Sequence, residues 1–178
     1  MMKMRLISAL LAAMLLLGAL TGCAPQPGVT EEGGTAATHQ TTEAVTLPDL
    51  QTLYDQGMEA LSKMGDEAPV LFPESNIQYL NEFYPGLADV AMKQFCAGVA
   101  PVTNAPFEVL LVEVADKADV QTVLNIFQAR ADRESADTTY PENAKAWMNN
   151  CKITSRGCYV FLAVLMDPCV VPAEFILD

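Results

Sequence analysis

The segment CKITSRGCYVFLAVLM, residues 151–166, has the pattern of a β-hairpin. Residues 151–154 form the first expected strand, residues 155–157 the turn, and residues 158–166 the second strand. The second strand contains no charged residue, which is typical of a central strand that is buried on both faces. Asp167 and Pro168 end it. The hairpin therefore predicts an antiparallel sheet with its second strand in the interior.

Two more strands are expected upstream of this hairpin. Residues 92–100 alternate in character, which places Phe95 and Cys96 on opposite faces of a strand. Residues 107–114 are apolar except for two glutamates. Adjacent hairpins favour an antiparallel sheet of about four strands covered by helices, and hence an α+β fold.

The helices are expected between and before these strands. Thr46 is the expected N-cap of the first helix, with Asp49 at the acidic position of a capping box. A short helix is expected over about residues 76–84, a long one from residue 116 towards 136, and one or two turns around Trp147 as a core anchor. The charged residues of the long helix are expected on its solvent side: Lys117, Asp119, Arg130, Asp132, Arg133 and Glu134.

The first 22 residues have the layout of a secretory signal. Lys3 and Arg5 precede an apolar run over residues 6–20. A helix of about 15 residues spans roughly 22 Å, which is short of the ~30 Å hydrocarbon core of a bilayer. A cleaved signal peptide over residues 1–22 is therefore the better interpretation than a permanent membrane anchor.

The end of this signal resembles the lipobox of bacterial lipoproteins, which comprises a branched apolar residue, a small residue, Gly or Ala, and Cys. All four positions fit, directly after the apolar run: Leu20, Thr21, Gly22 and Cys23. The resemblance implies that a diacylglycerol with chains such as palmitate is attached to Cys23, with cleavage just before it. Two such chains contribute on the order of 20 kcal/mol of membrane affinity. The alternative is an ordinary signal peptide with a chance cysteine.

The remaining composition divides the chain into a linker and one domain. Residues 24–45 are rich in Pro, Gly, Thr, Ala, Gln and Glu without apolar periodicity, so residues 23–45 are expected to be a disordered, lipid-bearing linker. Residues 46–178 suffice for a single α+β domain with its own core. Loss of residues 1–22 removes Lys3 and Arg5 and changes the formal charge from −12 to −14. Such an acidic chain is repelled by nucleic acid, which is excluded as a partner.

Four cysteines remain in the domain: Cys96, Cys151, Cys158 and Cys169. An exported location permits disulfides, and both disulfides and free thiols are open alternatives. In the expected hairpin, Cys151 lies roughly 10–13 Å along the strand from Cys158, beyond the ~7 Å between Cα atoms that a disulfide allows. We therefore expect no bond between these two. Since no pair has the close spacing of a structural zinc site, no metal site is expected.

The sequence offers no catalytic constellation. His39, the only histidine, lies in the linker, where it cannot be held in a fixed orientation as a base for a cysteine. Glu108 and Glu113 are an odd number of residues apart, so they are expected on opposite faces of their strand and not as a catalytic pair. A Gly-rich phosphate loop is also lacking. We assign no catalytic residue and no cofactor.

Three stretches carry a resemblance that runs from about residue 76 to residue 178. They are YPGL at 84–87, the strand at 107–114 followed by DKADV at 116–120, and RGCYVFL at 156–162. In order and spacing they resemble the bacterial lipoprotein family catalogued as domain of unknown function 4358. The family consists mainly of small lipobox proteins of low-GC Gram-positive bacteria, which implies a position on the outer face of the cytoplasmic membrane. The domain cysteines and two late prolines, Pro168 and Pro172, depart from the family pattern.

These observations predict a lipid-anchored extracytoplasmic protein that acts as a binding or accessory module of the cell envelope rather than as an enzyme. Its expected partners are the membrane, through the lipid on Cys23, and an envelope protein or small ligand. Two alternatives stay open. One is an envelope hydrolase that uses carboxylates, and the other is a thiol- or disulfide-dependent envelope protein.

Overall fold

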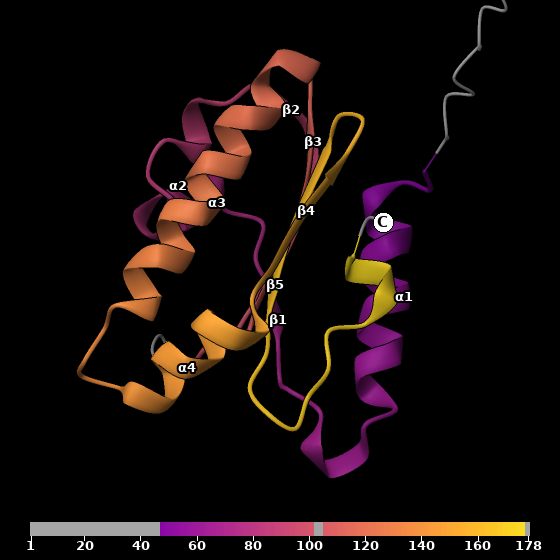
Figure 1. Cartoon of the computed structure of the whole chain (residues 1–178). Coiled ribbons are helices and arrows are strands. Elements are labelled where there is room, and N and C mark those ends of the chain that lie inside the picture. The colour runs from indigo at the N-terminus through magenta and orange to yellow at the C-terminus, as the bar shows by residue number, and fades with distance from the viewer. Residues whose placement is uncertain (1–46, 102–104, 177–178) are drawn as a thin grey trace, which may run out of the picture. The chain divides into compact units, whose positions relative to one another are not determined.

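A five-stranded antiparallel sheet forms the middle of the domain, with helices on both of its faces (Figure 1). The computed structural model describes residues 47–101 and 105–176; the expected signal peptide, lipobox and linker lie outside the described residues. The strand order is β1-β2-β3-β5-β4. The strands are β1 (Phe72–Pro73), β2 (Met92–Val99), β3 (Glu108–Val114), β4 (Lys152–Arg156) and β5 (Tyr159–Val164).

Four α-helices and four short 3₁₀ turns accompany the sheet within the described residues. The helices are α1 (Leu50–Ser62), α2 (Ile77–Phe83), α3 (Val120–Ser135) and α4 (Pro141–Asn150). The 3₁₀ turns are η1 (Gly65–Glu67), η2 (Leu87–Asp89), η3 (Lys117–Asp119) and η4 (Ala173–Phe175). The expected α+β fold is confirmed, and the strand count is five rather than four because β1 adds a short strand beside β2. Among the described residues, no helix is long and apolar enough to cross a membrane.

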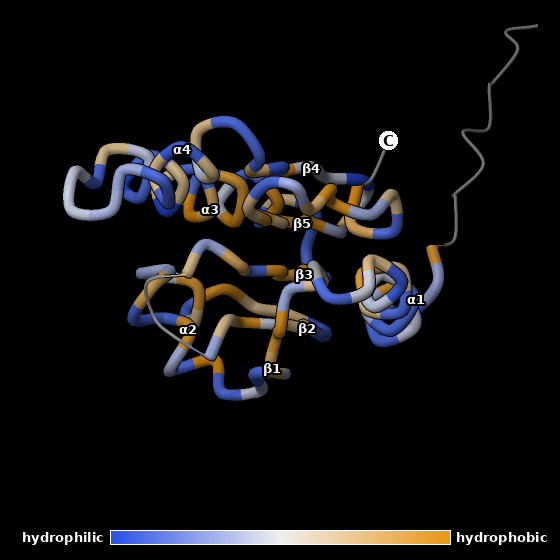
Figure 2. Tube along the Cα trace, turned by 90° about the horizontal axis from the view of Figure 1, so that it is seen from below, coloured by the Kyte–Doolittle hydropathy of each residue, from blue (hydrophilic) through white to orange (hydrophobic). Residues whose placement is uncertain are grey.

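The β4–β5 hairpin is confirmed, but its expected turn is wrong by two residues. Arg156 pairs with Tyr159, so the turn consists of Gly157 and Cys158 alone. Gly157 has a φ of +64°, a left-handed conformation that glycine adopts without steric cost. This tight turn lets β4 continue to Arg156. The expectation of a central β5 is confirmed, because β5 lies between β3 and β4 and all but its first residue are buried. Figure 2 colours the chain by hydropathy and shows β5 between its neighbours.

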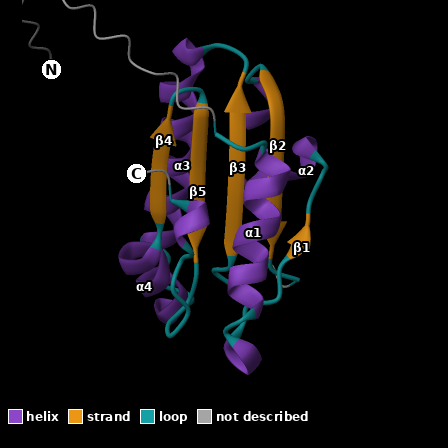
Figure 3. Ribbon diagram, turned by 90° about the vertical axis from the view of Figure 1, so that its right-hand side faces the viewer, coloured by secondary structure: helices purple, strands orange, loops and turns teal. Residues whose placement is uncertain are grey.

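The two faces of the sheet carry two separate hydrophobic cores because side chains alternate along each strand. Helices α2, α3 and α4 cover one face, and α1 with η4 covers the other (Figure 3). The first, which we call the α3-side core, contains Leu80, Tyr84, Leu87, Ala97, Leu110, Val112, Val114, Val123, Phe127, Ala131, Trp147, Val160, Leu162 and Val164. The second, the α1-side core, contains Leu50, Leu53, Tyr54, Leu61, Leu71, Val109, Leu111, Phe161, Ala163, Leu165, Cys169, Val171 and Phe175.

Local capping explains where the helices begin. Asp49 is itself the N-cap of α1 and accepts a hydrogen bond from the Thr52 backbone N–H at 3.0 Å. The predicted capping box was therefore wrong in placing Asp49 inside the helix; Thr46 lies outside the described residues. Asn76, where the short helix was expected to begin, is instead the N-cap of α2 and accepts bonds from two backbone N–H groups. Before α3, Asp116 caps the 3₁₀ turn η3, which delays the α-helix to Val120.

Candidate functional site

Arg130 of α3 is a buried residue, which corrects the prediction that all charges of this helix face solvent. Its exposed fraction is 6%, and it lies in the layer between α3, α4 and the sheet. The spacing explains this position, because residue 130 is three residues after the buried Phe127 and seven after the buried Val123. That is the apolar-stripe periodicity of a helix, and it places residue 130 on the inner face whatever its charge.

Two carboxylates flank the Arg130 guanidinium. Its Nη2 donates to Glu108 Oε1 at 2.5 Å, and its Nη1 donates to Glu134 Oε1 at 2.5 Å. Glu108 stands on the central strand β3, between Val99 of β2 and Val164 of β5. Its second oxygen, Oε2, accepts a hydrogen bond from the hydroxyl of Tyr84. Both oxygens of Glu108 are thus bound by donors of the protein.

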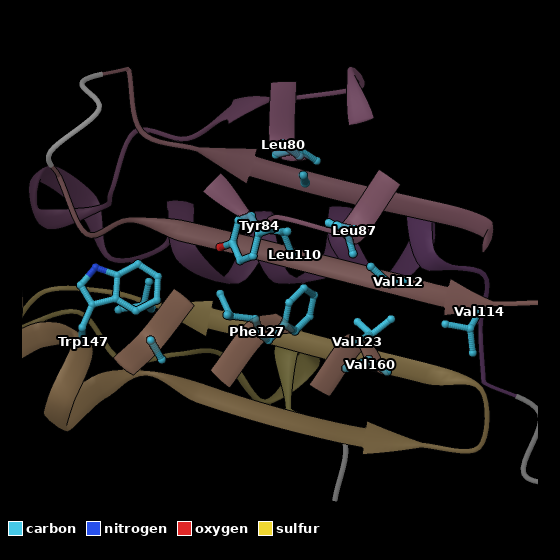
Figure 4. Close-up of a cluster of buried hydrophobic side chains, with 14 residues drawn as sticks. Leu80, Tyr84, Leu87, Leu110, Val112, Val114, Val123, Phe127, Trp147 and Val160 are labelled. Atoms are coloured by element: carbon cyan, nitrogen blue, oxygen red, sulfur yellow. The ribbon is translucent and has the colours of Figure 1, made fainter. Parts of the chain in front are cut away.

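Three aromatic rings surround the same guanidinium. Its Cζ lies 5.3 Å from the ring centre of Phe83, 5.7 Å from that of Tyr84 and 5.2 Å from that of Trp147. These distances lie within the ~6 Å range of cation–π attraction. The Tyr84 ring also packs edge-on against Phe127, and its hydroxyl points toward the Trp147 end of the α3-side core (Figure 4). The arginine is therefore held in one position from several sides.

The charges shift the pKa values of this cluster. Burial alone lowers the pKa of Arg130, but the neighbouring Glu108 outweighs it and raises the pKa above its ordinary value. Burial, reinforced by the charge of Glu108, raises the pKa of Tyr84 well above its usual 10. Arg130 is accordingly a fixed cation, and Tyr84 stays protonated as a hydrogen-bond donor.

A cavity of about 150 Å³, which we call the Arg130 cavity, opens beside this cluster. It lies between the start of β3, the C-terminal half of α3, the α3–α4 connection and α4. Its lining residues are Ala105, Glu108, Arg130, Glu134, Asp137, Tyr140, Asn143 and Trp147. A smaller and mainly apolar hollow of about 20 Å³ adjoins it and shares Ala105 and Glu108.

One donor of the cluster lacks a partner. The Arg130 Nε–H is buried and has no acceptor among the described residues. A buried donor of this kind costs about 1–3 kcal/mol when it stays unpaired. The Nε atom has almost no accessible surface, so this unpaired donor is part of the cost of burying Arg130.

The two glutamates of β3 lie on opposite faces, as expected. Glu113 is on the α1 side, where it accepts from Lys93 Nζ at 2.8 Å and from Gln94 Nε2 at 2.8 Å. Glu108 is on the other face, where Arg130 binds both Glu108 and Glu134. Sequence reasoning missed this grouping, although one signal was present: Glu108 and Arg130 are opposite charges that each fall on the buried face of their element.

The domain cysteines divide between the two faces of the sheet. Cys151 and Cys158 pack on the α3-side core, and Cys96 and Cys169 belong to the α1 side. Cys96, Cys151 and Cys158 are free thiols. Burial, with a contribution from Glu108, raises the pKa of Cys151 to about 12. A thiol with so little thiolate is a poor nucleophile, so none of the chemistry of the Arg130 cavity is assigned to it.

Metal ligands do not converge in the described part of the chain, where no group of three or more His, Cys, Asp or Glu side chains could hold an ion. Lipobox residues 20–23 lie outside it. The arrangement that the structure does bring together is a charged, hydrogen-bonded wall beside a small cavity. Both Glu108 oxygens in this wall are bound by donors of the protein, whereas the contacts of Glu134 with Arg130 and Arg133 involve only its Oε1.

Comparison with known proteins locates this site within one family. No curated protein and no solved structure matches the chain. One family model matches residues 73–165, a stretch that includes all of the side chains around Arg130. The chain belongs to the family described as Domain of unknown function (DUF4358).

Proposed function

We propose that this protein is a lipid-anchored, extracytoplasmic module that binds a small ligand in the Arg130 cavity. The observation that carries the binding function is the polar wall of the cavity, where Glu134 and Asp137 line the hollow and two carboxylates hold Arg130 in place. Ligand sites place a few oriented polar groups in a concave surface, and this wall has that character.

The anchor is proposed from the lipobox, with Cys23 as the lipidated residue. Two acyl chains bind a membrane firmly where a single chain binds only marginally. The acidic chain offers no electrostatic attraction to anionic headgroups, so the lipid is the source of membrane binding. Residues 24–45 then act as a tether between the membrane and the domain.

A carboxylate-dependent envelope hydrolase is the second candidate, because Glu134 and Asp137 line the same cavity. It is less well supported, since Glu134 already binds Arg130 and Asp137 accepts from the Thr139 backbone N–H at 2.7 Å. Recovery of a bound ligand unchanged after prolonged incubation supports the binding module; conversion of the ligand supports the hydrolase.

The anchor is tested by replacing the lipidated cysteine. A Cys23→Ala variant is expected to lose metabolic labelling by a palmitate analogue and to leave the membrane fraction. Cys96→Ala, in the folded domain, is the matched control and is expected to keep both properties. A Cys23→Ala protein that is still labelled contradicts lipidation at this residue.

The binding role is tested with the full-length chain by a fragment screen in NMR. Bound fragments are expected to shift the signals of residues around the Arg130 cavity. The Asp137→Asn variant is expected to bind these fragments more weakly. Glu142→Gln is the control, because Glu142 is an exposed acid of α4 that pairs with Lys145 outside the cavity. A screen with no fragment at this cavity contradicts the proposed binding site.

A further inference from the structure

Helix α1 and the turn η4 together form one layer over the sheet, which we call the terminal layer (Figure 3). Helix α1 precedes β1 in the chain, and η4 follows β5. Neither element lies within residues 73–165, the stretch that the family model matches. Because both elements lie outside the run of strands, they can leave the sheet without any strand changing its partners.

The two parts of the terminal layer depend on each other. The turn η4 has only three residues, which is too short to be stable alone. Its Phe175 is 1% exposed, and the ring occupies the space where a Cβ of Gly57 in α1 would lie. The same ring is 6.4 Å from the ring of Tyr54, centre to centre. Loss of α1 therefore uncovers Phe175, and we expect α1 and η4 to separate from the sheet together.

The helices of the other face are attached to the sheet in a different way. Helix α2 connects β1 to β2, and α3 with α4 connects β3 to β4, so these helices are held between strands. Arg130 of α3 also forms an ion pair with Glu108 of β3, and the hydroxyl of Tyr84 donates to the same carboxylate. Separation of these helices would break this buried cluster. The terminal layer has the lower barrier of connection, because it leads into the strands from one side only.

The inner surface of α1 carries a polar group that packing does not satisfy. The hydroxyl of Tyr54 is buried and has no hydrogen-bond partner among the described residues. A buried polar group without a partner opposes the closed arrangement, since water would bind it in the open one. The closed terminal layer is thus held by its apolar contacts and weakened at this hydroxyl.

We infer that the terminal layer opens and closes as one unit, while the sheet, the α3-side core and the Arg130 cavity stay formed. Local opening of this kind has a lower free energy than global unfolding. It uncovers an apolar face of the sheet that includes Val109, Leu111 and Phe161, each at most 1% exposed in the closed form. Exposure of this face is costly, so the open form is the minor one. The fold thereby contains a conformational device on the face opposite the Arg130 cavity.

The test is native-state hydrogen exchange of the full-length chain, followed by mass spectrometry of peptides. After correction for intrinsic exchange rates, α1 and η4 are expected to share one rate. We expect this rate to be at least about tenfold faster than the rate of β3 and α3, which exchange through global unfolding. Equal rates in all four elements, or a slow η4 beside a fast α1, would overturn the inference.

Substitutions in the α3-side core separate local opening from global unfolding. Val123→Ala removes packing that the open form keeps and the unfolded form loses. It is therefore expected to accelerate exchange in β3 and α3 and to leave α1 and η4 unchanged. Val160→Ala, at a second buried position of the same core, is expected to give the same pattern, and circular dichroism checks that each variant is folded. Acceleration of α1 to the same extent as β3 overturns the inference, because α1 then opens only with the whole domain.

A substitution in the terminal layer tests whether its two parts act together. Phe175→Leu shortens the contact between η4 and α1 and keeps an apolar side chain at this position. It is expected to accelerate exchange in α1 and in η4 by the same factor. Acceleration of η4 with no change in α1 overturns the inference, because the two elements then open separately.

Discussion

Arg130 contacts Glu108 on β3, Glu134 one turn further along α3, and three aromatic rings from α2, its C-cap and α4. Burial of an ion pair adds little net stability, because both charges lose their hydration. Removal of only one partner is costly, since the other charge then stays buried without compensation. The cluster therefore acts mainly to position side chains. Its contribution can be measured as the change in the free energy of unfolding when one of its charges is removed.

The first prediction concerns this loss. Arg130→Met is expected to lower the free energy of unfolding by about 3–5 kcal/mol, because Glu108 is left as an unpaired buried charge. Arg133→Met is the control on the same helix: its side chain is 47% exposed, and its loss is expected to cost about 1 kcal/mol or less. Urea unfolding followed by circular dichroism measures both. Equal losses for the two variants contradict the buried position of Arg130.

The second prediction concerns alkaline pH. The pKa of Tyr84 is raised in the folded protein, so the folded state keeps a proton that the unfolded state releases above about pH 10. The stability that Tyr84 contributes is complete below that pH and falls as pH rises beyond it. Tyr84→Phe is expected to flatten this decline in urea unfolding, whereas Tyr140→Phe, at an exposed tyrosine, is not. An unchanged slope in Tyr84→Phe argues against a buried, protonated Tyr84.

The third prediction concerns Cys151. Its pKa rises from 9.0 to about 12, which reduces the thiolate roughly a thousandfold at pH 8, at a factor of ten for each pKa unit. Iodoacetamide is expected to alkylate Cys151 at least a hundredfold more slowly in the native chain than in urea. Peptide mass spectrometry reports the rate at this site. Equal rates in the two conditions contradict a raised pKa for the Cys151 thiol.

At the scale of elements, α1 and η4 hold each other on the second face of the sheet. Gly57 is the contact point: a Cβ added there lies 2.2 Å from the ring of Phe175, which is buried. Helix propensity alone predicts that Gly→Ala in the interior of a helix stabilises by about 1 kcal/mol. Packing predicts the opposite sign at this position, because the buried Phe175 ring has to shift within the core to make space for the methyl group.

The fourth prediction uses this difference in sign. Gly57→Ala is expected to destabilise the domain by about 1–3 kcal/mol in urea unfolding. In a Phe175→Ala background the clash is gone, and the same substitution is expected to be neutral or stabilising. Stabilisation by Gly57→Ala in the otherwise unchanged chain contradicts the packing of η4 on α1.

Element identity was largely predictable from the sequence because capping residues and turn glycines act locally. The short helix expected over about residues 76–84 is present as α2, and the uncharged run after Gly157 is the buried strand β5. The bounds of the hairpin turn and the presence of β1 depend on pairing between strands, which local sequence patterns do not predict. The hairpin turn is shorter than expected because Arg156 pairs with Tyr159, and β1 exists only because β2 offers an edge beside it.

The candidate site was missed for a different physical reason. Charged residues on a helix are usually solvated, so the charge run of α3 predicts an exposed Arg130, although its spacing matches the buried Val123 and Phe127. The partner that makes its burial tolerable, Glu108, is 22 residues away in the sequence. The cluster follows from tertiary packing, and a local sequence pattern does not reveal it.

At the scale of the whole molecule, the family match and the site coincide. Residues 73–165 contain the sheet from Pro73 onward, the layer of α2, α3 and α4, and the entire Arg130 cavity. Helix α1 and the turn η4, which cover the other face, lie outside that stretch. The proposed lipid anchor at Cys23 is further towards the N-terminus, so attachment and binding are assigned to separate parts of the chain.

The central claim is that Arg130 is a buried, fixed cation beside the proposed ligand cavity. The most direct test is a ¹H–¹⁵N NMR spectrum of the arginine Nε–H groups in the full-length chain, with the signal assigned by its absence in Arg130→Lys. We predict a signal that is protected from exchange with water and that shifts when a fragment binds in the adjoining cavity. A signal that exchanges as fast as those of exposed arginines, or one that stays in place while a fragment occupies the cavity, would contradict the account.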